Sequence, residues 1–403
     1  MTRSVVVVGG GIAGSALAYA LATAGVDVVV LETSEEFADR VRGESMHVWG
    51  VAEARRLGVD TVLLDAGAHV APVWKSYTEG VSEAVDIPMS MMQPGIDGTL
   101  NLRHPDACQA LIDAAAAAGA KVERGVRDVR LSAGPSVGVG YRVGDDRRGI
   151  AAELVVGADG RASTVRKQAG ITLEQSETSS YIAGLLLDGV PDNHDVLAGE
   201  GDQFFLLLHQ GGGRARAYLV TGVSGRHRFA GANAASRFMD STANFTHPWS
   251  AAVARATPAG PCATYPGDDT WTASPHADGV VLIGDAAGYN DPIAGQGLSI
   301  ALRDARMVRD LVLANGRGPI DFRPYAEERL ERMRRLRLIA DILAVTHVED
   351  GADNRAARRA RFNEKMAEMD PGFFPLMVGA FVGPETVAAD LVDESVLDRI
   401  RNA

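Results

Sequence analysis

The chain of 403 residues contains very little cysteine, and this absence excludes two classes of protein. Cys108 and Cys262 are its only cysteines, too few for a disulfide framework or a cysteine-based zinc site. We interpret both as small apolar core residues, with Cys108 in a helix.

An excess of basic residues and a long hydrophobic run are also missing. The net charge of −12 argues against nucleic acid or anionic membrane as a partner, because both need a basic surface. No run of eighteen apolar residues lacks a helix-breaking glycine, so we expect no membrane span. The apolar N-terminal run continues as strand, turn, helix and strand, which differs from a signal peptide. The sequence therefore predicts a soluble, cytoplasmic protein.

Catalytic motifs built from side chains are missing as well. We find no Ser–His–Asp set, no P-loop and no cluster of metal ligands. The 45 glycines are more informative, because two glycine-rich loops each follow an apolar strand-like run. The chemistry is therefore expected to come from a bound cofactor.

The first loop has the spacing G-x-G-x-x-G between a strand over residues 4–8 and a helix. Gly9 allows the tight turn, Gly11 lets the backbone approach a pyrophosphate, and Gly14 lets helix and strand pack closely. Free N–H groups of the helix N-terminus then face the phosphates. Glu32, at the end of the next strand, is placed to bind a ribose diol. The pattern predicts dinucleotide binding without separating FAD from NAD, and the predicted cofactor contacts are Gly9, Gly11, Ile12, Ala13, Gly14 and Glu32.

Two later segments repeat the arrangement of an apolar strand followed by a polar loop. In "ELVVGADGRASTVRK" (153–167) the strand runs into Asp159, and in "VVLIGDAAGYNDPIAGQG" (280–297) it runs into Asp285. The helix expected after residue 297 has a buried face and an N-terminus that favours negative charge. The predicted cofactor contacts here are Asp159, Asp285, Pro292, Gly295, Gln296 and Gly297.

These three ordered motifs resemble the FAD-dependent, aromatic-hydroxylase-type (group A) flavoprotein monooxygenases with the p-hydroxybenzoate hydroxylase fold. The resemblance implies that one extended FAD spans both loops. The first loop would hold the pyrophosphate, with Glu32 on the adenosine ribose. Asp285 would bind the ribityl chain, and the amides of residues 295–297 would face the flavin pyrimidine edge. The segments 40–59 and 100–122 also resemble the family, which implies that Arg42 and Arg103 contact FAD.

The sequence departs from the family pattern at several positions. Gly288 stands where a histidine often follows G-D-A-A, and Ser299 stands where an asparagine often follows the last glycines. The Asp-Pro of "GYNDPIAGQG" resembles flavin-dependent halogenases. Their W-x-W-x-I-P motif is absent, however, Gln296 replaces their serine, and Lys75 is only a loose candidate for a catalytic lysine.

The predicted fold class is α/β (α+β overall), with a Rossmann-like FAD-binding domain, an inserted antiparallel-sheet substrate domain and a C-terminal helical region. We assign 1–72, 100–174 and 272–318 to the first, 73–99 and 175–271 to the second, and 319–403 to the third. Six arginines between 323 and 337 are interpreted as a solvated helix face paired with glutamates. Apolar candidates for the pocket wall are Trp74, Met89, Met91, Met92, Phe204, Phe205, Tyr218 and Tyr265, and the catalytic candidates are His47, Tyr289 and Asn290.

The resemblance implies a monooxygenase that uses NADPH or NADH and O2. A flavin C4a-hydroperoxide would hydroxylate or epoxidise a largely apolar organic small molecule, aromatic or polyketide-like. Reduction of a polyprenyl or other alkene, halogenation, and a redox-silent FAD-binding role stay open as alternatives. We expect a monomer or homodimer and no bound metal.

Overall fold

The computed structural model describes residues 3–41, 43–132, 137–191, 194–316, 318–351 and 353–402. Its first layer is a six-stranded sheet in the order β21–β22–β12–β1–β2–β8. All neighbours in this sheet are parallel except β21 and β22, which are antiparallel. The strands are β1 (Ser4–Val8), β2 (Asp27–Leu31), β8 (Lys121–Glu123), β12 (Leu154–Gly157), β21 (His276–Ala277) and β22 (Val280–Leu282).

Apolar residues run without interruption along β1 because both faces of this sheet are covered. Val5 and Val7 belong to the main core, which includes side chains of α1, α4 and α8. Val6 and Val8 belong to a second core shared with a three-stranded antiparallel sheet, β9 (Val126–Ser132), β10 (Val137–Val143) and β11 (Asp146–Ala152). The helices of this region are α1 (Ile12–Thr23), α2 (Val48–Leu57), α3 (Asp60–Asp65), α4 (His104–Ala117), α5 (Thr164–Gln168) and α8 (Gly297–Asn315).

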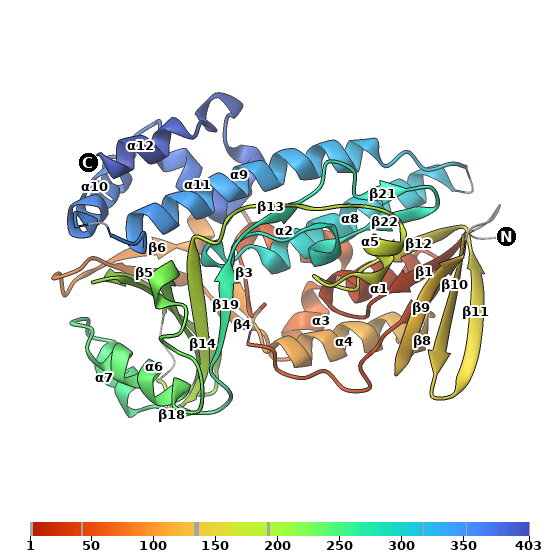
Figure 1. The fold of residues 1–403 in the computed structure, drawn as a ribbon, viewed down its shortest axis with the longest axis horizontal. Coiled ribbons are helices and arrows are strands. Elements are labelled where there is room, and N and C mark those ends of the chain that lie inside the picture. Colours follow the sequence, from red (N-terminus) through yellow and green to blue (C-terminus); the bar gives the residue numbers. More distant parts are fainter. Residues whose placement is uncertain are drawn as a thin grey trace.

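A large, mostly antiparallel sheet forms the other half of the molecule (Figure 1). Its order is β18–β14–β17–β16–β15–β5–β6, with β19 also paired to β14, and only β15 and β5 are parallel. The strands are β5 (Val73–Tyr77), β6 (Ala84–Pro88), β14 (Ser180–Asp188), β15 (Asp195–Glu200), β16 (Gln203–Gly211), β17 (Arg214–Gly222), β18 (Thr257–Pro258) and β19 (Ala263–Gly267). One face joins the main core, and the other packs under α6 (Ala234–Ala243) and α7 (Ser250–Arg255).

The described part of the chain also contains two smaller sheets and six 3-10 helices. A three-stranded sheet contains β3 (Ser45–Met46), β4 (His69–Ala71) and β7 (Thr99–Asn101), and a two-stranded one contains β13 (Glu174–Gln175) and β20 (Thr270–Trp271). The 3-10 helices are η1 (Met89–Met91), η2 (Val223–Gly225), η3 (Gly284–Ala287), η4 (Pro292–Ala294), η5 (Pro384–Thr386) and η6 (Ala389–Leu391).

The C-terminal part is helical, as predicted. Figure 1 shows the long helix α9 extending past both halves of the molecule, with the chain end beside α10 and α12. The helices are α9 (Arg323–His347), α10 (Arg355–Ala367), α11 (Phe374–Val382) and α12 (Ser395–Arg401). In the part of the chain that the structure describes, no helix is long and apolar enough to cross a bilayer.

The interpretation of the α9 arginines as a solvated face is wrong for Arg329 and Arg332. Both side chains are buried, and both pair with the buried Asp304 of α8, at 3.0 and 2.6 Å. Their positive charges therefore connect α9 to α8 inside the protein.

The predicted fold class is confirmed: a parallel α/β layer, an inserted antiparallel sheet and a helical C-terminal region are all present. The residue boundaries assigned to the three domains stay a prediction.

Candidate active site

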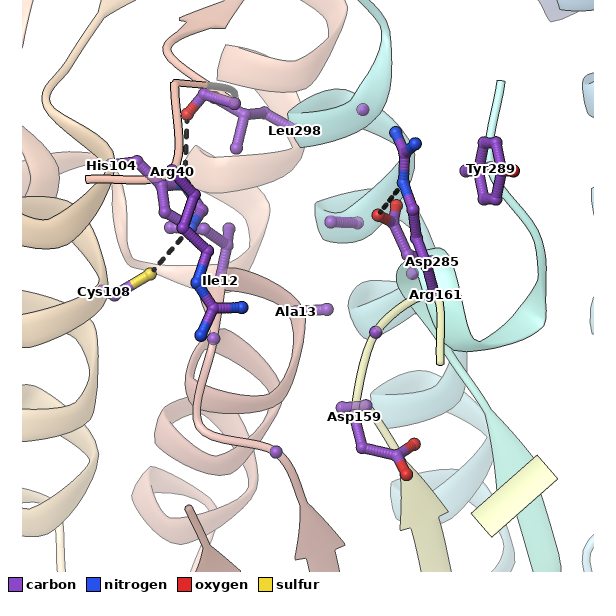
Figure 2. A pocket seen from close by; sticks show the side chains of 18 of the residues that line it. Ile12, Ala13, Arg40, His104, Cys108, Asp159, Arg161, Asp285, Tyr289 and Leu298 are labelled. Carbon is purple, nitrogen blue, oxygen red and sulfur yellow. Dashed lines mark hydrogen bonds and ion pairs between the residues drawn. The ribbon is translucent and has the colours of Figure 1, made fainter. Parts of the chain in front are cut away.

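A cavity of about 550 Å³ lies where the two glycine-rich loops meet the large sheet. Its wall combines the first loop, the end of β2, the start of α4, the loop after β12, one face of the large sheet and the loop between β22 and α8. Figure 2 shows Ala13 between two groups of side chains. Ile12, Arg40, His104 and Cys108 lie on one side, and Asp159, Arg161 and Asp285 lie on the other.

Close backbone contacts explain two glycines of the first loop. Gly9 has φ of +106°, and a Cβ there would lie 2.3 Å from the carbonyl oxygen of Ala158, in the loop after β12. A Cβ on Gly14 would lie 2.0 Å from the carbonyl oxygen of Gly9. These two residues therefore pack the first loop against its own helix and against the neighbouring loop. Gly9 lines the cavity and Gly14 lies behind its wall.

Gly11 and Gly297 have no such packing reason to be glycine. Gly11 precedes the first residue of α1, Gly297 is the first residue of α8, and both line the cavity. A Cβ on either would meet nothing within 4 Å, and neither has a positive φ. The missing side chains therefore leave space inside the cavity at two helix N-termini, where phosphates and other electron-rich groups bind well.

Glu32 lies at the cavity wall with its carboxylate held by backbone amides. One oxygen accepts from the amide of Gly10 and the other from that of Ser34, both at 2.6 Å. The side chain is buried and fixed, and each oxygen keeps a further lone pair for a ligand hydroxyl. This arrangement suits the ribose contact expected for Glu32.

Asp159 serves the start of α5 as well as the cavity wall. Its carboxylate accepts from the Ser163 hydroxyl at 2.5 Å and from the amides of Thr164 and Val165 at 2.7 and 3.1 Å. Three donors fix its position in the cavity lining.

Asp285 lines the cavity from η3, beside the start of α1. It forms an ion pair of 3.3 Å with Arg161, whose guanidinium stacks on the Tyr289 ring at 3.9 Å from the ring centre. Asp304 accepts from the amide of Gly284 at 2.9 Å, and Arg329 donates to the carbonyls of residues 284, 287 and 288. The turn that carries Asp285 is thus supported from two helices.

The family's histidine cannot stand at position 288 in this backbone. Gly288 has φ of +114°, and a Cβ there would lie 2.3 Å from the carbonyl oxygen of Thr270. The departure noticed in the sequence is therefore a requirement of local packing.

The loop before α8 is fixed by the side chain of Gln296, which is buried. Its amide oxygen accepts from the Trp49 indole at 2.9 Å, and its nitrogen donates to the carbonyls of Ala294 and Ala380 at 2.8 and 3.1 Å. Pro292, Gly295, Gln296 and Gly297 all line the cavity. Their backbone is held by α2 and α11 together.

The three catalytic candidates lie in different surroundings. His47 does not line the cavity; it is buried between Trp74 and Phe381, with Nε2 at 3.2 Å from the carbonyl oxygen of Ala294. Burial lowers the pKa of His47 to about 4, so the ring is neutral at pH 7. Tyr289 and Asn290 line the cavity, and they donate to Asp268 and Asp269 at 3.0 and 2.6 Å.

Burial, together with the nearby Asp268 carboxylate, raises the pKa of Tyr289 to about 12. Its hydroxyl therefore keeps its proton at neutral pH, and that proton is already donated to Asp268. These candidate roles stay predictions.

The two arginines expected near FAD give different outcomes. Arg42 lies outside the described residues. Arg103 pairs with Asp106 at 3.0 Å at the partly exposed start of α4 and is not among the cavity-lining residues. The cavity instead contains the guanidinium groups of Arg40 and Arg161, for which sequence reasoning assigned no role. Both stand next to a recognised motif, which is the signal that could have identified them.

The end of the cavity at the large sheet is mainly apolar. Ile182, Leu206, Leu208 and Tyr265 line it, together with Tyr218 and the carboxylate-bearing Glu44. Of the predicted wall residues, Tyr218 and Tyr265 are therefore present. Trp74, Met89, Phe204 and Phe205 are buried in the cores, Met91 is 80% exposed, and Met92 packs against the main core.

The profile of the FAD-binding domain family matches residues 2–336. The chain belongs to this family. The resemblance to group A flavoprotein monooxygenases is thereby confirmed, and so is FAD as the cofactor. The cavity fits this cofactor, because it joins two helix N-termini that begin at glycine to the carboxylates of Glu32 and Asp285. Arg40, Arg127 and Arg161 also line it.

Curated relatives of the family include lipid-modifying enzymes. Squalene monooxygenase SE2 of Panax ginseng is 26% identical over 322 residues, which are 76% of this chain and 57% of the relative. The chain thus spans little more than half the length of that relative. Digeranylgeranylglycerophospholipid reductase 2 of Methanopyrus kandleri is 30% identical over 329 residues, or 77% of each chain.

Solved structures of two flavin-dependent halogenating enzymes share the fold. CmlS, a flavin-dependent halogenase, superposes with a TM-score of 0.77 at 17% identity, over 100% of this chain and 77% of the other. The flavin-dependent brominase Bmp2 superposes with a TM-score of 0.77 at 18% identity, over the whole of both chains.

Proposed function

We propose that the protein is an FAD-dependent monooxygenase that uses NADPH or NADH and O2 to hydroxylate or epoxidise a largely apolar small molecule. The observation that carries the proposal is the shape of the cavity, which continues from the two glycine-rich loops to an apolar face of the large sheet. A cofactor held by the loops would meet a substrate lying against that face. We propose also that this sheet is the substrate domain.

Named residues would divide the work of holding FAD. Gly11 and the start of α1 would face the pyrophosphate, and Glu32 would bind the adenosine ribose. Asp285 would bind the ribityl chain, beside the amides of residues 295–297 at the flavin ring. FAD, when bound, accepts hydride from the nicotinamide and activates O2.

The protein's own part is to position the substrate and exclude water. Ile182, Leu206 and Leu208 supply an apolar wall that orients an apolar body and keeps bulk water away from it. Gln296, hydrogen-bonded to Trp49 and to two carbonyls, holds the loop before α8 in place. Arg40 and Arg161 place positive charge along the cavity, where it would offset the charge of a diphosphate.

Anaerobic addition of NADPH or NADH to the FAD-loaded protein tests this function. We expect the flavin absorbance to bleach, faster when a substrate is present. Subsequent mixing with isotopically labelled O2 should place one labelled oxygen atom in a phenol, a polycyclic aromatic or an alkene of the test panel. A flavin that neither nicotinamide reduces with any compound would favour the redox-silent alternative and refute the proposal.

Reduction of an alkene is the second candidate, because the archaeal reductase is 30% identical over 77% of both chains. Product formation without O2 would favour it. Halogenation lacks similar support from the site. Lys75 pairs with Asp86 at 2.7 Å between β5 and β6 and does not line the cavity.

A further inference from the structure

A buried charged cluster interrupts the apolar end of the cavity. Arg216 of β17 donates through Nε and Nη2 to the two carboxylate oxygens of Glu44, at 2.5 and 2.8 Å. Its Nη2 also donates to Asp39 at 2.7 Å. Arg216 is 1% exposed and Glu44 is 2% exposed, although Glu44 borders the cavity.

Tyr218 connects this cluster to the cavity. Its hydroxyl donates to Oε2 of Glu44 at 2.9 Å, and the residue lines the cavity. Burial, with the Glu44 carboxylate nearby, holds the pKa of Tyr218 well above its ordinary value. The hydroxyl therefore keeps its proton and donates a hydrogen bond to Glu44. Its own oxygen then remains as a hydrogen-bond acceptor, made more electron-rich by that donation.

The position of the Tyr218 ring is fixed by a glycine on the neighbouring strand. Gly184 of β14 stands directly opposite Tyr218 of β17 in the antiparallel pair. A Cβ on Gly184 would lie 2.7 Å from Cε1 of the ring and 2.6 Å from a methyl carbon of Val41. The ring thus occupies the space that a side chain at 184 would take, and the hydroxyl is held in one place.

Stability of the fold does not by itself account for such a cluster. A buried ion pair often stabilises a fold no more than apolar side chains of the same volume would, because both charges lose their hydration. The cluster also leaves buried polar atoms unused: within the described residues, Nη1 of Arg216 and Oγ of Ser45 have no hydrogen-bond partner. Ser45 follows Glu44 in the chain and also lines the cavity.

We propose that Tyr218 is a specificity-determining residue that accepts a hydrogen bond from a hydroxyl or N–H group of the substrate. Glu44 and Arg216 are positioning residues, which orient the Tyr218 hydroxyl and polarise it. The substrate class is then an apolar molecule that carries a hydrogen-bond donor, and a pure hydrocarbon chain fits less well. This inference rests on the proposed function in taking the sheet end of the cavity as the substrate site.

Pairs of ligands that differ by one hydrogen-bond donor test the inference through binding alone, without catalysis. Phenol and naphthol are each compared with their methyl ethers by calorimetry on the FAD-loaded protein, in the absence of nicotinamide. We expect the wild type to bind each hydroxyl compound about tenfold more tightly than its ether, the value of one hydrogen bond to a polarised group. Tyr218→Phe should reduce that preference to less than about twofold.

Two further variants separate specificity from structure. Tyr265→Phe removes another hydroxyl from the cavity wall, one that donates to the backbone of Arg40, and should keep the preference. Glu44→Gln keeps the side-chain size and should lower the preference while ether binding stays unchanged. A merely structural role of Glu44 would weaken both ligands equally.

Several outcomes overturn the inference. They are a wild type without preference for the hydroxyl compounds, a Tyr218→Phe variant that retains it, and an equal loss in Tyr265→Phe. Tyr218→Phe leaves the Glu44–Arg216 pair intact, so it decides the question even if Glu44→Gln fails to fold. Failure of the proposed function is seen separately, as a flavin that nicotinamides do not reduce.

Discussion

Substitution of Gly11 by alanine separates a packing role of the first loop from a cofactor role. A Cβ at this position would enter the cavity without meeting any protein atom within 4 Å. The backbone has φ of −74° and ψ of −168°, which any residue adopts. We therefore expect the fold to accept the methyl group and the bound cofactor to reject it.

The two expected magnitudes differ clearly. Alanine reduces the entropy of the unfolded chain, which stabilises by about 0.4–1 kcal/mol. It is a poorer residue than glycine before the first turn of α1, which costs a similar amount, so unfolding should change by less than about 1 kcal/mol. A methyl group forced against a closely packed ligand costs about 1–3 kcal/mol. The Kd for FAD should therefore rise roughly 5- to 150-fold.

The assay pairs FAD titration, followed by flavin fluorescence, with urea unfolding of the flavin-free protein. Gly14→Ala is the matched control, because its Cβ would lie 2.0 Å from the carbonyl oxygen of Gly9. This control should lose roughly 3 kcal/mol of stability or more. The reasoning is refuted if Gly11→Ala binds FAD like the wild type, or if it unfolds as easily as Gly14→Ala.

Two further predictions concern the support of the site. Asp304→Asn leaves Arg329 and Arg332 buried without their shared carboxylate. The free energy of unfolding in urea should therefore fall by about 3 kcal/mol or more. The control Asp106→Asn, at an exposed ion pair, should lower it by less than about 1 kcal/mol. Because the folded protein lowers the pKa of His47 from 6.5 to about 4, the unfolded chain binds more protons between these values, and stability falls as the pH drops through this window. His47→Gln removes that contribution, so the stability difference between wild type and variant should change by roughly 1.4 kcal/mol per pH unit there and not above pH 7; a parallel pair of pH profiles would contradict it.

Much of the fold around the cavity could be predicted, because its sequence signals each lie within a short segment of the chain. The glycine spacing after residue 8 and the apolar run before Asp285 each lie within one strand–loop–helix unit, and the structure has both units. The hairpin of β16 and β17 also follows from two apolar runs around a glycine turn.

The cluster at the substrate end could not be predicted, because its members are distant in the chain. Glu44 and Arg216 are 172 residues apart, and no periodicity joins them. Arg329 and Asp304 lie on different helices, so their burial depends on how α9 packs on α8. The sequence makes His47 a catalytic candidate, whereas tertiary packing puts its side chain behind the loop that carries Ala294.

The stoichiometry of FAD binding tests most directly the claim that one cavity joins both loops around one cofactor. Calorimetric titration of the flavin-free wild type should give one FAD per chain. Gly11→Val in the first loop and Gly297→Val in the second should each abolish that single site, since both missing Cβ atoms face the same cavity. Binding of FAD that survives unchanged in either folded variant would contradict the account.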